Sequence, residues 1–131
     1  MTLRTASCCC GALSLRAEGE PLRISVCHCL ECQKRTGSAF GVQARYRDED
    51  ISVSGTPSTY ARKGDEGGTA VFRFCGTCGT TLYWQADALA GFTTVAVGAF
   101  ADPAFPRPRV SVYGVRRHPW AVVEGIEERF D

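Results

Sequence analysis

Apolar and polar residues alternate along much of the chain. A period of two puts every second side chain on the same face of an extended strand. Several of these segments are separated by turns that carry proline or glycine, as in residues 102–108. The pattern predicts strands over residues 13–17, 22–26, 51–53, 70–74, 92–97, 110–115 and 120–123. We therefore expect an all-β protein.

Helical segments are few and short in this interpretation. One or two helical turns are expected through residues 33–35, with Gly37 as a left-handed stop, and a further turn over residues 48–50. Residues 62–68, rich in charge and glycine, predict an exposed loop between two strands. No repeat or linker divides the chain, so residues 1–131 are expected to form a single domain.

The charge balance excludes some classes of partner. The chain has 15 Lys and Arg against 14 Asp and Glu, a formal net charge of +1. This balance gives no general attraction for nucleic acid or an anionic membrane. The longest apolar run, residues 95–101, is too short to cross a bilayer and is interpreted as a buried strand and its exit. We expect a soluble, cytoplasmic protein.

All eight cysteines lie in three clusters, at residues 8–10, 27–32 and 75–78. Cys75 and Cys78 have the spacing with which a turn brings two thiolates onto one zinc ion. Cys8 and Cys10 would lie about 6.6 Å apart on a strand, farther than two sulfurs on one zinc, so the chain must bend there. Gly11 permits that bend.

The middle cluster offers three thiolates within six residues, Cys27, Cys29 and Cys32, here called the triplet. Structural zinc sites have four protein ligands, whereas catalytic sites use three and leave a position for water or substrate. Cys9 can be set aside if it acts as a small apolar residue and not as a ligand. The pairs Cys8/Cys10 and Cys75/Cys78 can then combine into one closed centre with four ligands. The triplet then remains as an open one.

The spacing alone leaves alternatives open. Cys75 or Cys78 can instead complete the triplet, and His28 or an acidic side chain can close it, which would make both centres structural. Disulfides are disfavoured because no apolar signal segment is found at the N-terminus, and such spacing in an intracellular protein is typical of metal binding.

With these motifs in view, the chain resembles the glutathione-dependent formaldehyde-activating enzyme family, whose domain is shared with centromere protein V. The resemblance covers nearly the whole chain. It rests on the three cysteine motifs in order, with Lys34, Gly37 and residues 40–41 behind the second of them. Residues 95–98, 102–103 and Trp120 add to it near the end of the chain.

The resemblance implies a β-tent fold of several antiparallel sheets held by two zinc ions. It implies a structural centre of Cys8, Cys10, Cys75 and Cys78 and a catalytic centre of Cys27, Cys29 and Cys32. The implied activity is that of a carbon–sulfur lyase, which condenses glutathione with formaldehyde to S-hydroxymethylglutathione. Glutathione, or another small thiol, and an aldehyde would be the partners.

Glutathione carries two carboxylates, so its site should contain cations. Lys34 and Arg35 follow the triplet closely and are the expected binding residues. Weaker candidates are the scattered basic residues Arg45, Arg47, Arg62 and Lys63.

Three aromatic residues and one histidine have ambiguous roles in this interpretation. Phe40 and Trp84 can line a cleft but are better interpreted as core, as is Trp120. His28 lies between two ligands, and we expect its side chain to point away from the metal, as a structural histidine or, alternatively, as a group that transfers a proton in the reaction.

Two functions remain compatible with the sequence. One is the enzyme described above, and the other is a zinc-stabilised binding module whose triplet is closed by a fourth protein ligand. The fourth coordination position of the triplet discriminates between them.

Overall fold

The computed structural model describes residues 2–64 and 67–131, and it is mainly β. One helix, α1 (Leu30–Thr36), and four short 3-10 turns complete it. The strands are β1 (Leu3–Ser7), β2 (Ser14–Glu18), β3 (Arg23–Cys27), β4 (Gly41–Arg47), β5 (Ile51–Ser54), β6 (Ser58–Lys63), β7 (Thr69–Phe74), β8 (Thr81–Ala86), β9 (Phe92–Ala96), β10 (Val110–Val112) and β11 (Glu128–Phe130).

The strands form two sheets. The small sheet has the order β1-β2-β5 and is antiparallel, and the large sheet has the order β11-β10-β3-β4-β9-β8-β7-β6. The expectation of an all-β fold is confirmed. It needs one correction, since β10 runs parallel to both β3 and β11. The chain reaches β10 through the long segment after β9, and no hairpin joins β10 to β3, so nothing forces an antiparallel pairing.

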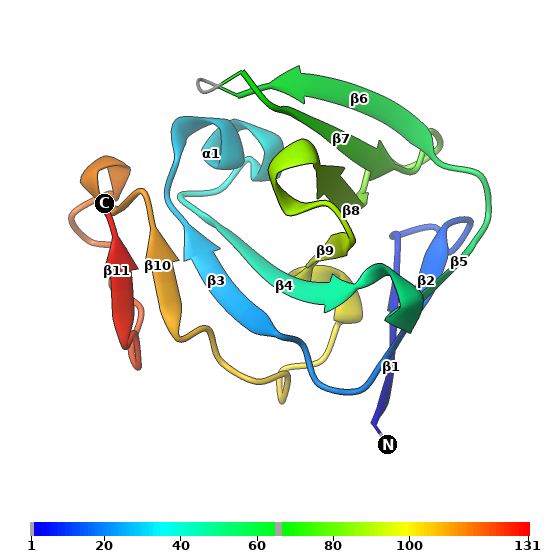
Figure 1. Ribbon diagram of the computed structural model, residues 1–131, viewed down its shortest axis with the longest axis horizontal. Helices are drawn as coiled ribbons and strands as arrows, with labels where there is room; N and C mark the ends of the chain where they lie inside the picture. Colours follow the sequence, from blue (N-terminus) through cyan, green and yellow to red (C-terminus); the bar gives the residue numbers. More distant parts are fainter. Residues whose placement is uncertain (1, 65–66) are drawn as a thin grey trace.

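The large sheet curves around the single helix (Figure 1). The carboxyl end of β3 leads into α1, which lies in the drawing beneath β6 and β7. Contacts from the helix support this placement: Glu31 lies 3.9 Å from Arg62 of β6, and the Arg35 guanidinium lies 4.4 Å from the ring centroid of Trp84 in β8. The helix therefore sits on the concave side of the sheet.

The core lies where the small sheet packs against the large one. Leu13 and Leu15 from the first hairpin and Leu82 and Val95 from the large sheet are buried together, each at most 1% exposed. Their alternate spacing along the strands is the pattern that the sequence shows. Phe100 extends this cluster through a stacked contact with Phe105, at 4.7 Å between ring centroids.

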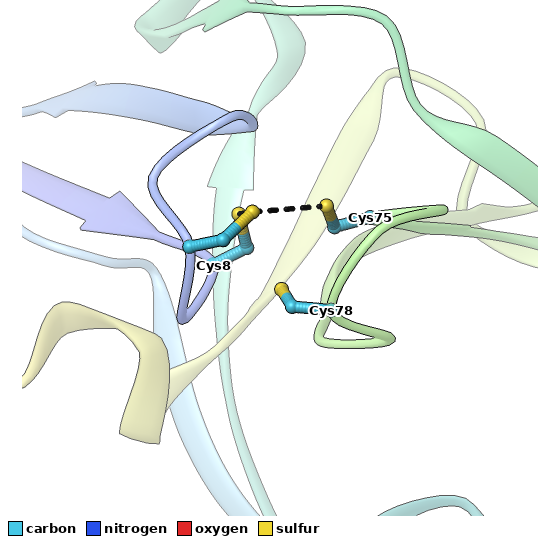
Figure 2. Close-up of side chains that lie close together, drawn as sticks. Cys8, Cys75 and Cys78 are labelled. Atoms are coloured by element: carbon cyan, nitrogen blue, oxygen red, sulfur yellow. Dashed lines mark hydrogen bonds between the residues drawn. The ribbon is translucent and has the colours of Figure 1, made fainter.

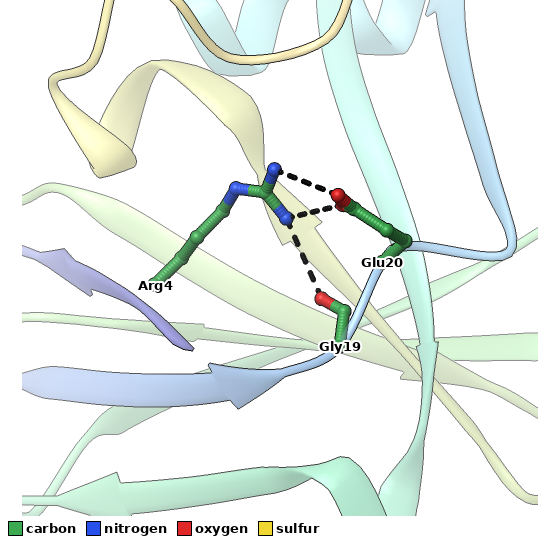
Figure 3. A network of polar contacts seen from close by, with 3 residues as sticks. All are labelled: Arg4, Gly19 and Glu20. Carbon is green, nitrogen blue, oxygen red and sulfur yellow. Dashed lines mark hydrogen bonds and ion pairs between the residues drawn. The ribbon is translucent and has the colours of Figure 1, made fainter. Parts of the chain in front are cut away.

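A polar clamp fastens the edge strand β1 to the turn after β2 (Figure 3). The guanidinium of Arg4 donates to both carboxylate oxygens of Glu20, at 2.6 and 3.2 Å, and to the carbonyl oxygen of Gly19 at 3.4 Å. Arg4 also lies 5.0 Å above the ring of Phe105. Because its side chain is only 16% exposed, this bidentate pair is screened less than an ordinary surface pair.

Most expected strands are confirmed, with boundary shifts of about one residue. The expected strand over 120–123 is wrong: Trp120 lies in a turn, and residues 121–123 have no regular secondary structure. Trp120 is 71% exposed and does not belong to the core. The strand expected over 110–115 ends at Val112, because Tyr113 takes a left-handed conformation with φ 56°. Strands β1, β4, β6, β8 and β11 were not anticipated.

The helical expectations are confirmed. Helix α1 ends at Gly37, which has φ 65° and donates its backbone N–H to the carbonyl of Gln33. Residues 48–50 form a 3-10 turn. Of the predicted loop 62–68, Arg62 and Lys63 belong to the end of β6, and residues 65–66 lie outside the described residues.

No helix in the described part of the chain combines the length and apolar character needed to cross a membrane.

Gly55, between β5 and β6, packs closely against the loop that joins β1 to β2, and a substitution there tests this packing. It has φ +96°, and a Cβ atom there would collide with the backbone oxygen of Ala12. We expect Gly55→Ala to lower the free energy of unfolding by more than the roughly 1 kcal/mol that a left-handed alanine costs. Gly19→Ala is the matched control, since Gly19 has φ +77° with nothing within 4 Å of its Cβ position. Equal losses in urea unfolding of the two variants would contradict this packing.

Candidate metal centres and the adjoining cleft

Four cysteines from two distant segments converge into one group, here called the tetrad: Cys8, Cys10, Cys75 and Cys78. Their sulfur atoms all lie within 4.8 Å of one another. Figure 2 shows Cys8, on the loop after β1, facing Cys75 and Cys78 on the turn after β7. The Sγ atoms of Cys8 and Cys10 are 3.7 Å apart, and those of Cys10 and Cys75 are 3.6 Å apart.

Each half of the tetrad lies on a tight turn that the local sequence dictates. After β1 the chain reverses through Gly11, at φ 82°, whose N–H donates to the Cys8 carbonyl. After β7 it reverses through Gly79, at φ 80°, whose N–H donates to the Cys75 carbonyl. The bend expected at Gly11 is therefore present.

Thr80 connects the two halves. Its hydroxyl oxygen accepts the backbone N–H of Cys9 at 3.1 Å and lies 3.4 Å from Cys78 Sγ. This hydroxyl and the Thr80 backbone lower the pKa of Cys78 to about 5. Cys9 itself is exposed and is not in the tetrad, in agreement with its exclusion as a ligand.

The triplet is a second group whose sulfurs lie within 4.8 Å of one another. Cys27 is the last residue of β3, Cys29 is the N-cap of α1, and Cys32 lies in the first helical turn. The Cys29 sulfur accepts the backbone N–H of Cys32 at 3.3 Å. All eight cysteines are free, and Cys75 and Cys78 belong to the tetrad, so neither completes the triplet.

The three thiols of the triplet share their protons unequally. Hydrogen bonds from Cys27 and then Cys32 lower the pKa of Cys29 to about 2, and the nearby Arg62 guanidinium adds to this effect. The hydrogen bond to Cys29 raises the pKa of Cys27. A thiolate at the helix N-cap also faces the positive end of the helix. Cys29 is therefore the thiol of the triplet that loses its proton most readily, because its pKa is lowered while those of Cys27 and Cys32 are raised.

Side chains anchor the helix that carries Cys32. The Gln33 amide nitrogen donates to the carbonyls of His28 and Arg116, at 2.9 and 3.2 Å, and its oxygen lies 2.9 Å from His118 Nε2. On the other side Gly41 lets β4 approach closely, since a Cβ there would lie 2.9 Å from an Arg35 nitrogen.

His28 does not belong to the triplet, as expected from its place between two ligands. Its ring is 2% exposed and makes an edge contact with Phe40, at 5.8 Å between centroids. Burial lowers the pKa of His28, and Arg117 and His118 lower it further. The histidine is therefore a neutral, buried side chain.

Cys29 opens onto a cleft of about 610 Å³. Its other lining residues come from α1, from the end of β6 and from the C-terminal part of the chain. Three of them are cations: Arg62, Lys63 and Arg116. Tyr60 and Tyr113 contribute phenol groups to the walls, and Glu31 and Asp131 contribute carboxylates. The cleft thus joins a sulfur of the triplet to a partly cationic surface.

Lys34 and Arg35 line a neighbouring cleft of about 430 Å³ that contains none of the triplet cysteines. The Lys34 side chain is 77% exposed and lies 3.8 Å from Glu31. Arg35 stacks on Trp84, which is buried. Arg62 lines both clefts and connects them. Sequence reasoning ranked Arg62 and Lys63 below Lys34 and Arg35, and it missed Arg116, because separation along the chain gives no signal of this convergence.

Comparison with known families and structures accounts for these motifs. The family model of the glutathione-dependent formaldehyde-activating enzyme matches residues 3–116. The chain belongs to this family. The resemblance read from the cysteine motifs is thus confirmed. No curated protein matches the chain.

The fold also has a counterpart among solved structures. The crystal structure of a Rhodobacter sphaeroides protein superposes with a TM-score of 0.58 at 24% sequence identity, covering 72% of this chain and 85% of that one. At this identity the likeness concerns the fold alone.

Metal analysis of cysteine variants tests the two groups separately. We expect Cys29→Ser to lose about one equivalent of bound metal with little loss of thermal stability, because the triplet is local. Cys10→Ser should lower the melting temperature strongly, since its tetrad joins distant segments. Cys9→Ser is the control and should match the parent in metal content and stability. A metal equivalent lost in Cys9→Ser would contradict the assignment of the tetrad.

Proposed function

We propose that this chain is a zinc-dependent enzyme of the carbon–sulfur lyase type, which condenses glutathione or another small thiol with formaldehyde or a related aldehyde. The product is an S-hydroxymethyl adduct. In this proposal Cys8, Cys10, Cys75 and Cys78 hold a structural zinc ion, and Cys27, Cys29 and Cys32 hold a catalytic one. The family supports the substrate pair, and the two cysteine groups support the metal.

The single observation that carries the proposal is the open triplet. Among the residues that the structure describes, the metal-competent group there contains three sulfurs and no fourth donor. One of them, Cys29, lines a cleft whose volume lies in the range typical of small-molecule sites. A binding module would require a fourth protein ligand at this place.

The donors fit zinc. Sulfurs at about 2.3 Å from a tetrahedral ion lie roughly 3.8 Å apart. In the tetrad the Cys10 sulfur lies 3.7 Å from that of Cys8 and 3.6 Å from that of Cys75. When bound at the triplet, zinc would supply a position where a substrate thiol loses its proton readily.

The cations of the cleft suit the charge of glutathione. Its two carboxylates can pair with Arg62, Lys63 or Arg116, which line the same cleft as Cys29. Glu31 also lines both clefts, and its carboxylate lies 3.9 Å from the Arg62 guanidinium. Lys34 and Arg35, the residues expected from the sequence, would contact only a substrate that extends into the neighbouring cleft.

The reaction itself asks little of the protein beyond positioning. The substrate sulfur forms a bond to the carbonyl carbon, the π electrons move to the oxygen, and the proton released by the thiol ends on that oxygen. Holding thiol and aldehyde together removes most of the entropic barrier. The cleft offers several donors for the developing alkoxide, namely the phenol groups of Tyr60 and Tyr113 and the N–H groups of Arg62, Lys63 and Arg116.

The proposal places the enzyme in the cytoplasm. Thiolate ligands must stay reduced to bind metal, and the cytoplasm keeps thiols in that state.

Exchange NMR at equilibrium tests the activity directly. Protein shown to hold two zinc ions should speed the interconversion of formaldehyde plus glutathione with their adduct above the uncatalysed rate. Cys29→Ser, which keeps the tetrad, should return the rate to that of the buffer. Equal rates for parent, variant and buffer would refute the formaldehyde reaction and favour a different thiol substrate or the binding module.

A second test concerns the substrate cations. We expect Arg62→Gln and Arg116→Gln each to weaken glutathione binding roughly tenfold, as the loss of a charge-assisted hydrogen bond predicts. Lys34→Gln is the control and should change binding little, because Lys34 lies in the other cleft and is largely exposed. If the thiol instead bound along the exposed side of α1, Lys34→Gln would weaken glutathione binding more than Arg62→Gln and Arg116→Gln do, which would contradict the proposed site. Titration calorimetry on zinc-loaded protein measures all three.

A further inference from the structure

Two arginines face each other on the concave side of the large sheet. Arg23 of β3 and Arg45 of β4 are direct partners in the antiparallel ladder. Like charges directly opposite each other on neighbouring strands destabilise a sheet. The fold therefore keeps an unfavourable pair at a place where one neutral residue would remove the repulsion.

Among the residues that the structure describes, no ion pair within 4.0 Å includes Arg23 or Arg45. Another hollow beside Arg23 is lined by three carboxylates, Glu20, Glu127 and Glu128. Glu20 is bound to Arg4 and Glu127 to Arg109, and Glu128 lies beyond ion-pairing distance of either Arg23 or Arg45. Burial, followed by the charge of Arg23, lowers the pKa of Arg45.

The two arginines line a small cavity of about 70 Å³, whose other lining residues are the polar Ser25, Gln43 and Thr94 and the apolar Trp84, Ala86 and Leu89. Ser25 and Thr94 are buried, at 5% and 8% exposure. Two buried polar atoms among these lining residues, Arg23 Nε and Gln43 Oε1, lack a hydrogen-bond partner within the described chain. Two positive charges therefore line the cavity, together with one donor, Arg23 Nε, and one acceptor, Gln43 Oε1, that have no partner in the described part of the chain.

We propose that this cavity is a binding site for a small oxyanion, such as sulfate, phosphate or a carboxylate group. It is separate from the metal groups and needs no assumption about the reaction. The chemical class follows from the donors: guanidinium groups match the paired oxygens of carboxylates and of tetrahedral anions.

The arrangement of the side chains allows such an anion to bind. Phe130 covers one face of the Arg23 guanidinium, at 5.5 Å, and leaves the N–H edge for an anion. The Gln43 amide can turn to present its NH₂ group, because its oxygen holds no donor. An anion here offsets the repulsion between the two arginines.

The cavity lies on the same face of β3 as the triplet. Arg23, Ser25 and Cys27 alternate along this strand, so the α-carbon of Arg23 lies roughly 13 Å from that of Cys27. The oxyanion bound in this cavity can have two sources. One is a carboxylate at the far end of an extended thiol substrate, and the other is a free inorganic anion.

The test is an NMR titration of the zinc-loaded protein with potassium sulfate, at ionic strength held constant with potassium chloride. The backbone amides of Ser25, Gln43 and Thr94 should shift and saturate. Arg45→Gln should weaken the apparent affinity roughly tenfold or more, as expected for a lost charge-assisted hydrogen bond. Arg47→Gln is the matched control, the same change on an exposed residue of the same strand, and should bind as the parent does.

Thermal unfolding without sulfate checks whether Arg45→Gln is folded, and Arg23→Gln serves as a second variant if it is not. A titration with glutathione distinguishes the two sources. If glutathione shifts the same backbone amides and displaces sulfate, the site takes a substrate carboxylate. If glutathione does neither, while sulfate still saturates the site, the site takes a free anion. Chemical shifts that rise linearly with sulfate concentration would overturn the proposal. Equal shifts in the parent, Arg45→Gln and Arg23→Gln would overturn it as well.

Discussion

The convergence of the tetrad is the constraint on which the rest of the structure depends. It joins the loop after β1 to the turn after β7, and Cys10 and Cys75, 65 positions apart, have their sulfurs 3.6 Å from each other. A metal ion held by the tetrad would close this long loop and so restrict the unfolded chain strongly. The closed segment contains β3, α1 and β4, and so it contains the whole triplet. Opening the tetrad would release both ends of the segment that carries the proposed catalytic centre.

The triplet depends on its surroundings in a different way, because it is local. Its helix has seven residues, and Cys32 is the only one of them that is buried. An apolar face therefore cannot hold α1 in place, and a helix of this length is not stable alone. Contacts made by Gln33 to the His28 and Arg116 carbonyls, and by Arg35 to Trp84, hold it instead. The helix is thus positioned by the same elements that form the cleft walls.

The sequence predicted the features that local chemistry dictates: the cysteine groups, the turn at Gly11, the helix stop at Gly37 and the strands with clean alternation. It did not reveal β6, where charged and apolar residues mix along a largely exposed strand. It also did not reveal β8, where the consecutive residues Leu82, Tyr83 and Trp84 are all buried and so do not alternate with polar ones. The prediction for Trp120 is wrong because a large aromatic residue is usually buried, yet here it packs against the ring of His118 and is largely exposed. The parallel pairing of β10 has no local signal at all.

The candidate site shows the same division between local and distant residues. Closeness in sequence suggested Lys34 and Arg35 as substrate residues, but successive helical residues point about 100° apart, so neighbours of a ligand need not share its surface. The cations beside Cys29 come from the end of β6 and the turn after β10, segments that contain no cysteine motif. They can be changed by substitution while the sulfur groups stay intact. Membership of the family therefore constrains the metal-binding groups more closely than it constrains the thiol that this cleft accepts.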